Sequence, residues 1–241
     1  KSELDCVMVY EPTIQCSSLD VLFLLASLTM EWLKKIPITY KGQLTDVRLL
    51  NFSVVIDEVR DKIPEGLVAL DDNGRALISM VDVKLKQMRL RGLPAFSGFS
   101  YRHIAFRLLV DDAKYNKSGF PQGIYFLKSF TNSPWVAKVG NLMTYYNLTH
   151  AFIREEGQCV QLQCKGKIIS YELVQSDKAS PVEENHRQAI QRIDRAYLRQ
   201  GEILKRIIIA REKGPIEPIN CLSFRNDFFA SARLVSAFEV K

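Results

Sequence analysis

His103 and Arg107 are the two residues whose types and spacing most directly suggest a binding site. They lie four positions apart in a predicted strand, Tyr101 to Val110, so their side chains point to the same face, about 13 Å apart. Ala105 lies between them and leaves room for a ligand. The same face can instead be simply exposed to solvent, and the sequence leaves both interpretations open.

Lys128 and His150 are two further candidates for chemistry. Lys128 is isolated in an apolar run, Gly123 to Phe130, where burial would lower its pKa and favour a Schiff-base amine. Its long side chain can equally reach the surface. His150 alternates with Leu148 and Phe152 on a predicted strand, a pattern that fits a hydrogen-bonded core histidine or a functional one.

Several classes of enzyme motif are missing from the sequence. It contains no phosphate-binding glycine loop, no nucleophile elbow and no His-Glu-x-x-His segment. The five cysteines include no Cys-x-x-Cys pair, so we expect reduced thiols rather than a zinc site. We therefore expect neither a metal ion nor a cofactor.

The distribution of charge and of apolar residues restricts the kinds of partner that we expect for this protein. The 241 residues include 33 Lys and Arg against 27 Asp and Glu, but the basic residues are spread along the chain, so we expect no nucleic-acid partner. The apolar run Val21 to Leu28 is too short to span a bilayer. These features predict a cytoplasmic protein with no membrane span.

The elements that must position these residues are mostly strands. Turn residues Asp71 to Gly74 predict a hairpin, and the alternation of the strand that follows slips near Gln87, as a β-bulge would cause. A long amphipathic helix is predicted over 183–200, and Pro215 and Pro218 suggest an extended loop. Further strands are predicted at 44–55, 101–110, 123–130, 147–154, 158–165, 168–175, 203–211 and 228–240, with short helices at 57–62 and 135–143.

A set of short segments, read in order, resembles one known family. The segments are Ile63 to Leu67, Gly74 to Ala76, Arg91 to Pro94, Arg107, Gly123 to Phe126 and Gly140 to Ala151. Together they resemble the YqjF-like proteins, a domain-of-unknown-function family whose fold is similar to that of acetoacetate decarboxylase. The resemblance covers residues 30–241 and implies one domain, with 1–29 an N-terminal extension that need not belong to the native fold.

The resemblance also implies what the site lacks. In the decarboxylases a lysine of a Pro-Lys-Lys segment forms a Schiff base, but Leu148 and Thr149 stand at the corresponding pair here. Neither side chain has an amine, so the usual imine cannot form at this place. His103 stands at the position of a family glutamate, and His150 matches a histidine that YqjF-like proteins often carry.

These observations lead to one fold and three functional hypotheses. The fold is α+β and mainly antiparallel β, with a curved sheet closed into a cone-like barrel, one long helix and a few short ones. The leading hypothesis is a pocket inside the barrel for a small, partly apolar organic molecule that can be anionic, bound by His103, Arg107, Tyr125, Lys128, Asn141 and His150.

Two alternatives stay open at this point. The first is a lyase that uses a relocated lysine, Lys128 or Lys138, or a histidine as an acid and base. The second is an interaction module that uses the basic helix 183–200. The sequence decides neither the catalytic residues nor the oligomeric state.

Overall fold

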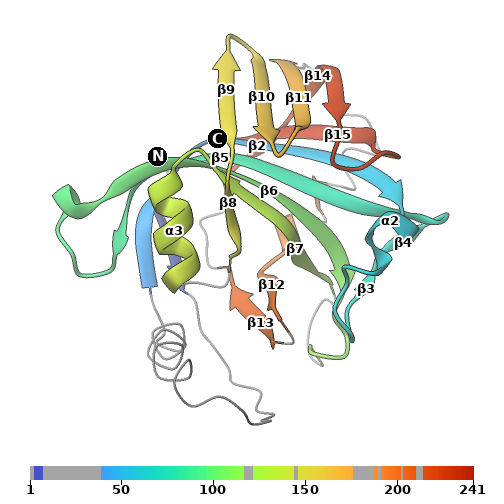
Figure 1. The fold of residues 1–241 in the computed structure, drawn as a ribbon, viewed down its shortest axis with the longest axis horizontal. Helices are drawn as coiled ribbons and strands as arrows, with labels where there is room; N and C mark the ends of the chain where they lie inside the picture. Colours follow the sequence, from blue (N-terminus) through green and yellow to red (C-terminus); the bar gives the residue numbers. More distant parts are fainter. Residues whose placement is uncertain are drawn as a thin grey trace.

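The computed structural model describes residues 3–7, 39–116, 122–143, 146–175, 187–188, 191–201, 203–209 and 214–241. Four long antiparallel strands form its centre (Figure 1): β2 (Thr39–Val55), β5 (Arg75–Leu90), β6 (Phe99–Asp111) and β7 (Gln122–Thr131). They belong to a sheet in the order β13-β12-β7-β6-β5-β2-β15-β14-β11-β10-β9. The predicted, mainly antiparallel β architecture is therefore confirmed.

The remaining strands flank this centre. On one side lie β12 (Arg195–Gln200) and β13 (Ile203–Ile208). On the other side lie β15 (Arg233–Val240), β14 (Ile216–Asn226), β11 (Lys167–Gln175), β10 (Cys159–Cys164) and β9 (Phe152–Glu156). Short strands β1 (Glu3–Val7), β3 (Val68–Ala69), β4 (Asp71–Asp72) and β8 (Leu148–His150) pair with β2, β6, β5 and β7.

The helices among the described residues are short. They are α2 (Asp57–Arg60), α3 (Pro134–Met143) and a 3₁₀ turn at Ala95–Ser97. None of these helices is long and apolar enough to cross a membrane. Figure 1 shows α3 lying to one side of the central strands, near β8.

The core follows from the alternation along β6. Ile104, Phe106, Leu108 and Val110 are completely buried, as the pattern predicts. Phe106 packs edge-on against Phe52 of β2 and against Phe229 after β14. The apolar face of β6 is thus the floor of the main core, and the opposite face carries His103 and Arg107.

The predicted hairpin and bulge are both present. Asn73 and Gly74 have positive φ angles, as a tight hairpin turn between β4 and β5 requires. Gln87 also has a positive φ, of 53°, and the register of β5 against β6 shifts between Leu85 and Met88. The slip in alternation therefore marks a real bulge.

Closure of the sheet into a barrel is not found among the described residues, where β13 and β9 end the strand order without pairing with each other. Polar contacts instead tie β9 to the centre. Glu155 of β9 accepts hydrogen bonds or ion pairs from Arg48, Lys84 and Arg102 at 2.8, 2.9 and 3.0 Å. Arg102 also binds both oxygens of the buried Asp82, at 2.7 and 2.5 Å.

The long helix predicted over 183–200 is wrong at its C-terminal end, where residues 195–200 form β12. Ala196, Tyr197 and Leu198 are consecutive and all buried, and a helix with one apolar face cannot bury three residues in a row. Residues 187–188 and 191–192 are helical, and 183–186 and 189–190 lie outside the described residues.

The extended loop predicted at Pro215 and Pro218 is also wrong, since β14 occupies Ile216–Asn226. Ile216 to Pro218 pair with β15, whereas the residues from Ile219 onward pair with β11. Pro218 lies where the strand changes partners, a position at which a missing N–H disturbs the sheet least.

Candidate functional site

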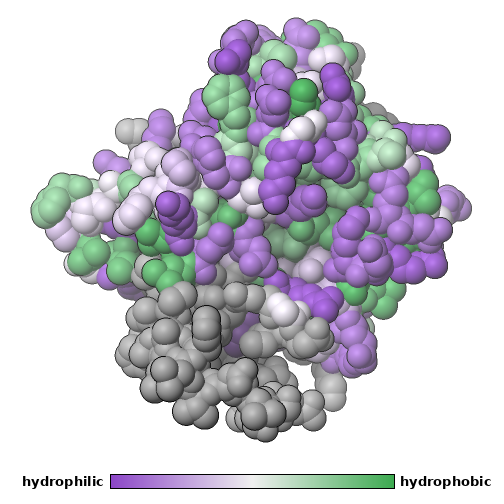
Figure 2. Space-filling view, in the orientation of Figure 1, coloured by the Kyte–Doolittle hydropathy of each residue, from purple (hydrophilic) through white to green (hydrophobic). Residues whose placement is uncertain are grey.

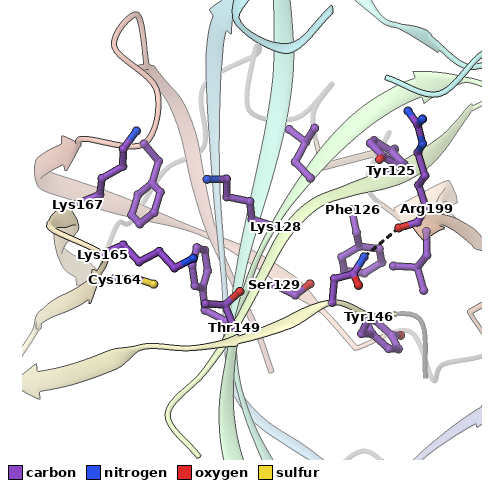
Figure 3. A pocket seen from close by; sticks show the side chains of 15 residues that line it. Tyr125, Phe126, Lys128, Ser129, Tyr146, Thr149, Cys164, Lys165, Lys167 and Arg199 are labelled. Atoms are coloured by element: carbon purple, nitrogen blue, oxygen red, sulfur yellow. Dashed lines mark hydrogen bonds between the residues drawn. The ribbon is translucent and has the colours of Figure 1, made fainter. Parts of the chain in front are cut away.

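A cavity of about 320 Å³ opens between β7, β8, β12 and the turn from β10 to β11. Its walls carry the cations Lys128, Lys165, Lys167 and Arg199, and no acidic side chain is among its described lining residues. We call it the cationic cavity. Figure 3 shows Lys165 and Lys167 on one side of it, Tyr125 and Arg199 on the other, and Lys128 between them.

A bulge in β7 places Tyr125 and Lys128 in the same cavity. Lys128 lies opposite Phe106 and Tyr125 lies opposite Leu108, so Leu127 is an extra residue in the ladder. Paired residues share a face of a sheet, and therefore both side chains lie on the face of Phe106 and Leu108. Without the bulge, residues three apart would point to opposite faces.

Lys128 is in a positively charged and aromatic environment. Its Nζ lies 5.3 Å from the centre of the Phe228 ring, within the range of a cation–π contact. Burial lowers the pKa of Lys128, and the positive charges of Lys167, Lys62 and Lys165 lower it further. Its side chain nevertheless remains open to the cavity.

Tyr125 forms the other described polar group on this face of β7. The residue is buried, and burial raises the pKa of its hydroxyl while the charge of Arg199 opposes that shift. Tyr125 is therefore protonated at neutral pH, when its hydroxyl can donate a hydrogen bond to an anion.

A tight turn supplies the two lysines of the opposite wall. Lys165 and Gly166 have φ angles of 50° and 77°, and the flanking residues Cys164 and Lys167 are paired. Two consecutive positive φ angles are typical of the type I′ turn that joins antiparallel strands. Lys165 and Lys167 are exposed at the mouth of the cavity.

The third wall comes from β8 and β12. Thr149 lines the cavity from β8. Asn147 donates a hydrogen bond of 2.9 Å to the backbone oxygen of Arg199, which fixes the start of β8 against β12 (Figure 3). Arg199 is half-buried.

The structure distributes the six predicted ligand-binding residues over several places. Tyr125 and Lys128 line the cationic cavity. His103 lines a second, apolar cavity on the other face of the sheet. Arg107, Asn141 and His150 are lining residues of neither cavity.

The last three residues have other surroundings. Arg107 donates to the backbone oxygen and to Oγ of Ser79, at 3.2 and 3.0 Å. Asn141 bonds both the N–H and the carbonyl of Leu148, at 2.6 and 2.8 Å, and so holds β8 against α3. His150 is exposed on β8.

Sequence reasoning missed Lys165, Lys167 and Arg199. The Lys-Gly-Lys turn is visible in the sequence, but nothing local indicates that it faces β7 across the molecule. Arg199 was placed on the predicted helix, which the structure replaces with β12. Among the described residues, no cluster of three or more His, Cys, Asp or Glu side chains is suited to a metal ion.

Comparison with solved structures defines the fold class. An acetoacetate decarboxylase from Legionella pneumophila subsp. pneumophila str. Philadelphia 1 is similar, with a TM-score of 0.56, 9% identity, and coverage of 83% of this chain and 82% of that one. An acetoacetate decarboxylase-like enzyme from Sphingomonas wittichii RW1 is similar at a TM-score of 0.55 and 12% identity, covering 83% and 87%. The fold is therefore acetoacetate decarboxylase-like.

A third similar structure is the enduracididine biosynthesis enzyme MppR, complexed with the condensation product of pyruvate and imidazole 4-carboxaldehyde. Its TM-score is 0.51 at 12% identity, and 83% of each chain is covered. No curated protein matches the chain. Residues 41–239 match the model of DUF2071, described as an uncharacterized conserved protein, and the chain belongs to that family.

Proposed function

We propose that this protein binds a small, partly apolar organic anion, such as an aromatic carboxylate, in the cationic cavity. The observation that carries the proposal is the charge of the walls, which hold four cations and, among the described residues, no acidic group. Phe126, Phe130 and Phe228 supply apolar surface beside those cations. A carboxylate on an apolar body matches this combination of charge and surface.

The size and openness of the cavity support the same class of ligand. A volume of about 320 Å³ lies at the lower end of the range for small-molecule sites. Lys165 and Lys167 are exposed in the turn from β10 to β11 and attract an anion as it approaches, and Lys128 and Tyr125 of β7 are placed to bind it.

The experiment compares benzoate with its neutral analogue benzamide by isothermal titration calorimetry. We expect benzoate to bind more tightly, and Lys128→Met to weaken benzoate by roughly tenfold or more, because a hydrogen bond to a charged group contributes about 1.5–3 kcal/mol. Lys138→Met is the matched control, since Lys138 is exposed on α3 and lines neither cavity. Equal affinity for benzoate and benzamide would refute the proposal.

A second candidate function is imine chemistry at Lys128, favoured by the lowered pKa of its amine. The neutral Nζ would attack the carbonyl carbon of a β-keto acid, and the carbonyl oxygen would leave as water to give a protonated imine. The electron pair of the bond to the carboxylate could then move toward the iminium as carbon dioxide leaves. No histidine lines this cavity among the described residues, so nothing here supports a histidine as the acid and base.

Borohydride reduction in the presence of acetoacetate tests this second function. We expect a covalent adduct on Lys128, located by peptide mass spectrometry, that disappears in Lys128→Met and persists in Lys138→Met. If the native protein binds benzoate but forms no adduct at Lys128, the imine chemistry is refuted and the binding function stands.

A further inference from the structure

A second cavity, of about 380 Å³, lies on the opposite face of the central strands from the cationic cavity. Its floor is formed by Val81, Val83 and Leu85 of β5, and α3 contributes Val136 and Val139. We call it the apolar cavity. Arg89 is the one cation, and no acidic residue occurs, among its described lining residues.

The rim of this cavity is also apolar. Leu93, Phe99 and Trp135 all line it, and 48%, 41% and 68% of their surfaces are exposed. Figure 2 shows hydrophobic surface over the side of the molecule where α3 and the β5–β6 connection lie. A ligand that enters here therefore removes aromatic and aliphatic surface from water, which favours an apolar molecule.

One polar atom in this wall has no partner. The Nε2 atom of His103 is buried and makes no hydrogen bond with any described residue. The imidazole ring meets the ring of Tyr146 edge-on, with the centroids 6.2 Å apart. A buried polar atom without a partner destabilises a protein, and a ligand that supplies the missing hydrogen bond relieves that cost.

The charge state of His103 indicates the chemistry of that ligand. Burial lowers the pKa of His103 to about 4, with a further contribution from the positive charge of Arg107. The ring is neutral at pH 7, so it does not attract an anion, and a hydrogen bond to it involves no charged group on the protein side. A hydroxyl group fits because it can donate a hydrogen bond to Nε2 when the ring proton is on Nδ1.

We propose that the apolar cavity is a second binding site, for an uncharged and mostly apolar molecule that carries one hydroxyl group, with the hydroxyl hydrogen-bonded to His103. Two observations carry it: the largely apolar wall between β5, β6 and α3, and the buried Nε2 that lacks a partner. This site is independent of the anion proposed for the cationic cavity, although Phe126 and Tyr146 line both.

The experiment uses 2-naphthol and 2-methoxynaphthalene, which share an aromatic body but differ in the ability to donate a hydrogen bond. Calorimetry on the full chain is expected to show 2-naphthol binding about 2- to 12-fold more tightly, the range that a net hydrogen bond provides. His103→Phe keeps a planar ring without nitrogen, and should abolish the preference. His103→Gln restores a hydrogen-bonding group and should recover part of it.

Two more variants separate binding in this cavity from adsorption elsewhere. Val139→Trp fills the cavity from α3 and should weaken both probes at least tenfold, whereas Lys138→Met changes the adjacent exposed residue and should leave both unchanged. Circular dichroism establishes that each variant is folded. Equal affinities for the two probes, a preference that survives in His103→Phe, or full binding in Val139→Trp would each overturn the proposal.

Discussion

Glu155 is the residue whose removal most directly tests how the end of the sheet is held over its centre. Its carboxylate contacts Arg48, Lys84 and Arg102, which lie on three different central strands. Burial alone would raise the pKa of Glu155, but hydrogen bonds from Lys84 and Arg48 and the charge of Arg102 lower it to about 2. Glu155→Gln keeps the shape of the side chain and removes this charge.

The lowered pKa sets both the sign and the size of the effect. A carboxyl group with an ordinary value of 4.5 in the unfolded chain and about 2 in the folded chain stabilises the fold above pH 4.5. That contribution is lost as the pH falls from 4.5 through 2. A difference of 2.5 pKa units corresponds to roughly 3 kcal/mol at neutral pH, an upper figure because Glu155 is partly exposed.

Urea denaturation of the native chain and Glu155→Gln between pH 7 and pH 2.5 measures this directly. We expect Glu155→Gln to unfold with up to about 3 kcal/mol less free energy at pH 7, and the two proteins to converge as the pH approaches 2.5. Glu156→Gln is the control, since the Glu156 side chain is 76% exposed and lies 3.8 Å from Arg154. A difference between the native chain and Glu155→Gln that stays constant with pH would refute this account of the network.

Two further predictions concern residues that position the sheet. Arg102→Met leaves the buried Asp82 carboxylate without its cation and should lower the free energy of unfolding, measured with urea, by about 3–5 kcal/mol. The double variant with Asp82→Asn should lose less than the sum of the two single changes. Additive losses would contradict a direct interaction between the two side chains. Asn141→Ala removes both hydrogen bonds to Leu148 and should cost about 1–3 kcal/mol, with faster amide hydrogen exchange at Leu148. Unchanged exchange at Leu148 would show that Asn141 does not hold β8.

The local pattern of the sequence was sufficient for much of the sheet. The alternation in β6 correctly assigns its buried face, and the slip near Gln87 identifies a bulge, because side chains on a strand must alternate between faces. The glycines at 157 and 166 were enough to place the turns of the β9–β11 meander. These features depend on neighbours in the chain, so they can be recognised without the tertiary structure.

Residues 195–200 show where this approach fails. Their apolar positions fit a helix period, but the segment lies between β7 and β13, where both faces are covered and a strand can bury every residue. Whether both faces are covered depends on elements distant in sequence. A helix prediction from the local pattern therefore cannot take the covering of both faces into account.

The sequence by itself determined that the chain is mainly antiparallel β and that Lys128 stands alone in an apolar strand. Only the tertiary structure decided which residues share a cavity. A bulge at Leu127 turns Lys128 to the same face as Tyr125, and the fold brings Lys165, Lys167 and Arg199 around them. His103 and Lys128 were both singled out from the sequence, but they lie on opposite faces of one sheet. Successive side chains in a strand alternate between the two faces, so a shift of one residue in the pairing moves a side chain to the other face.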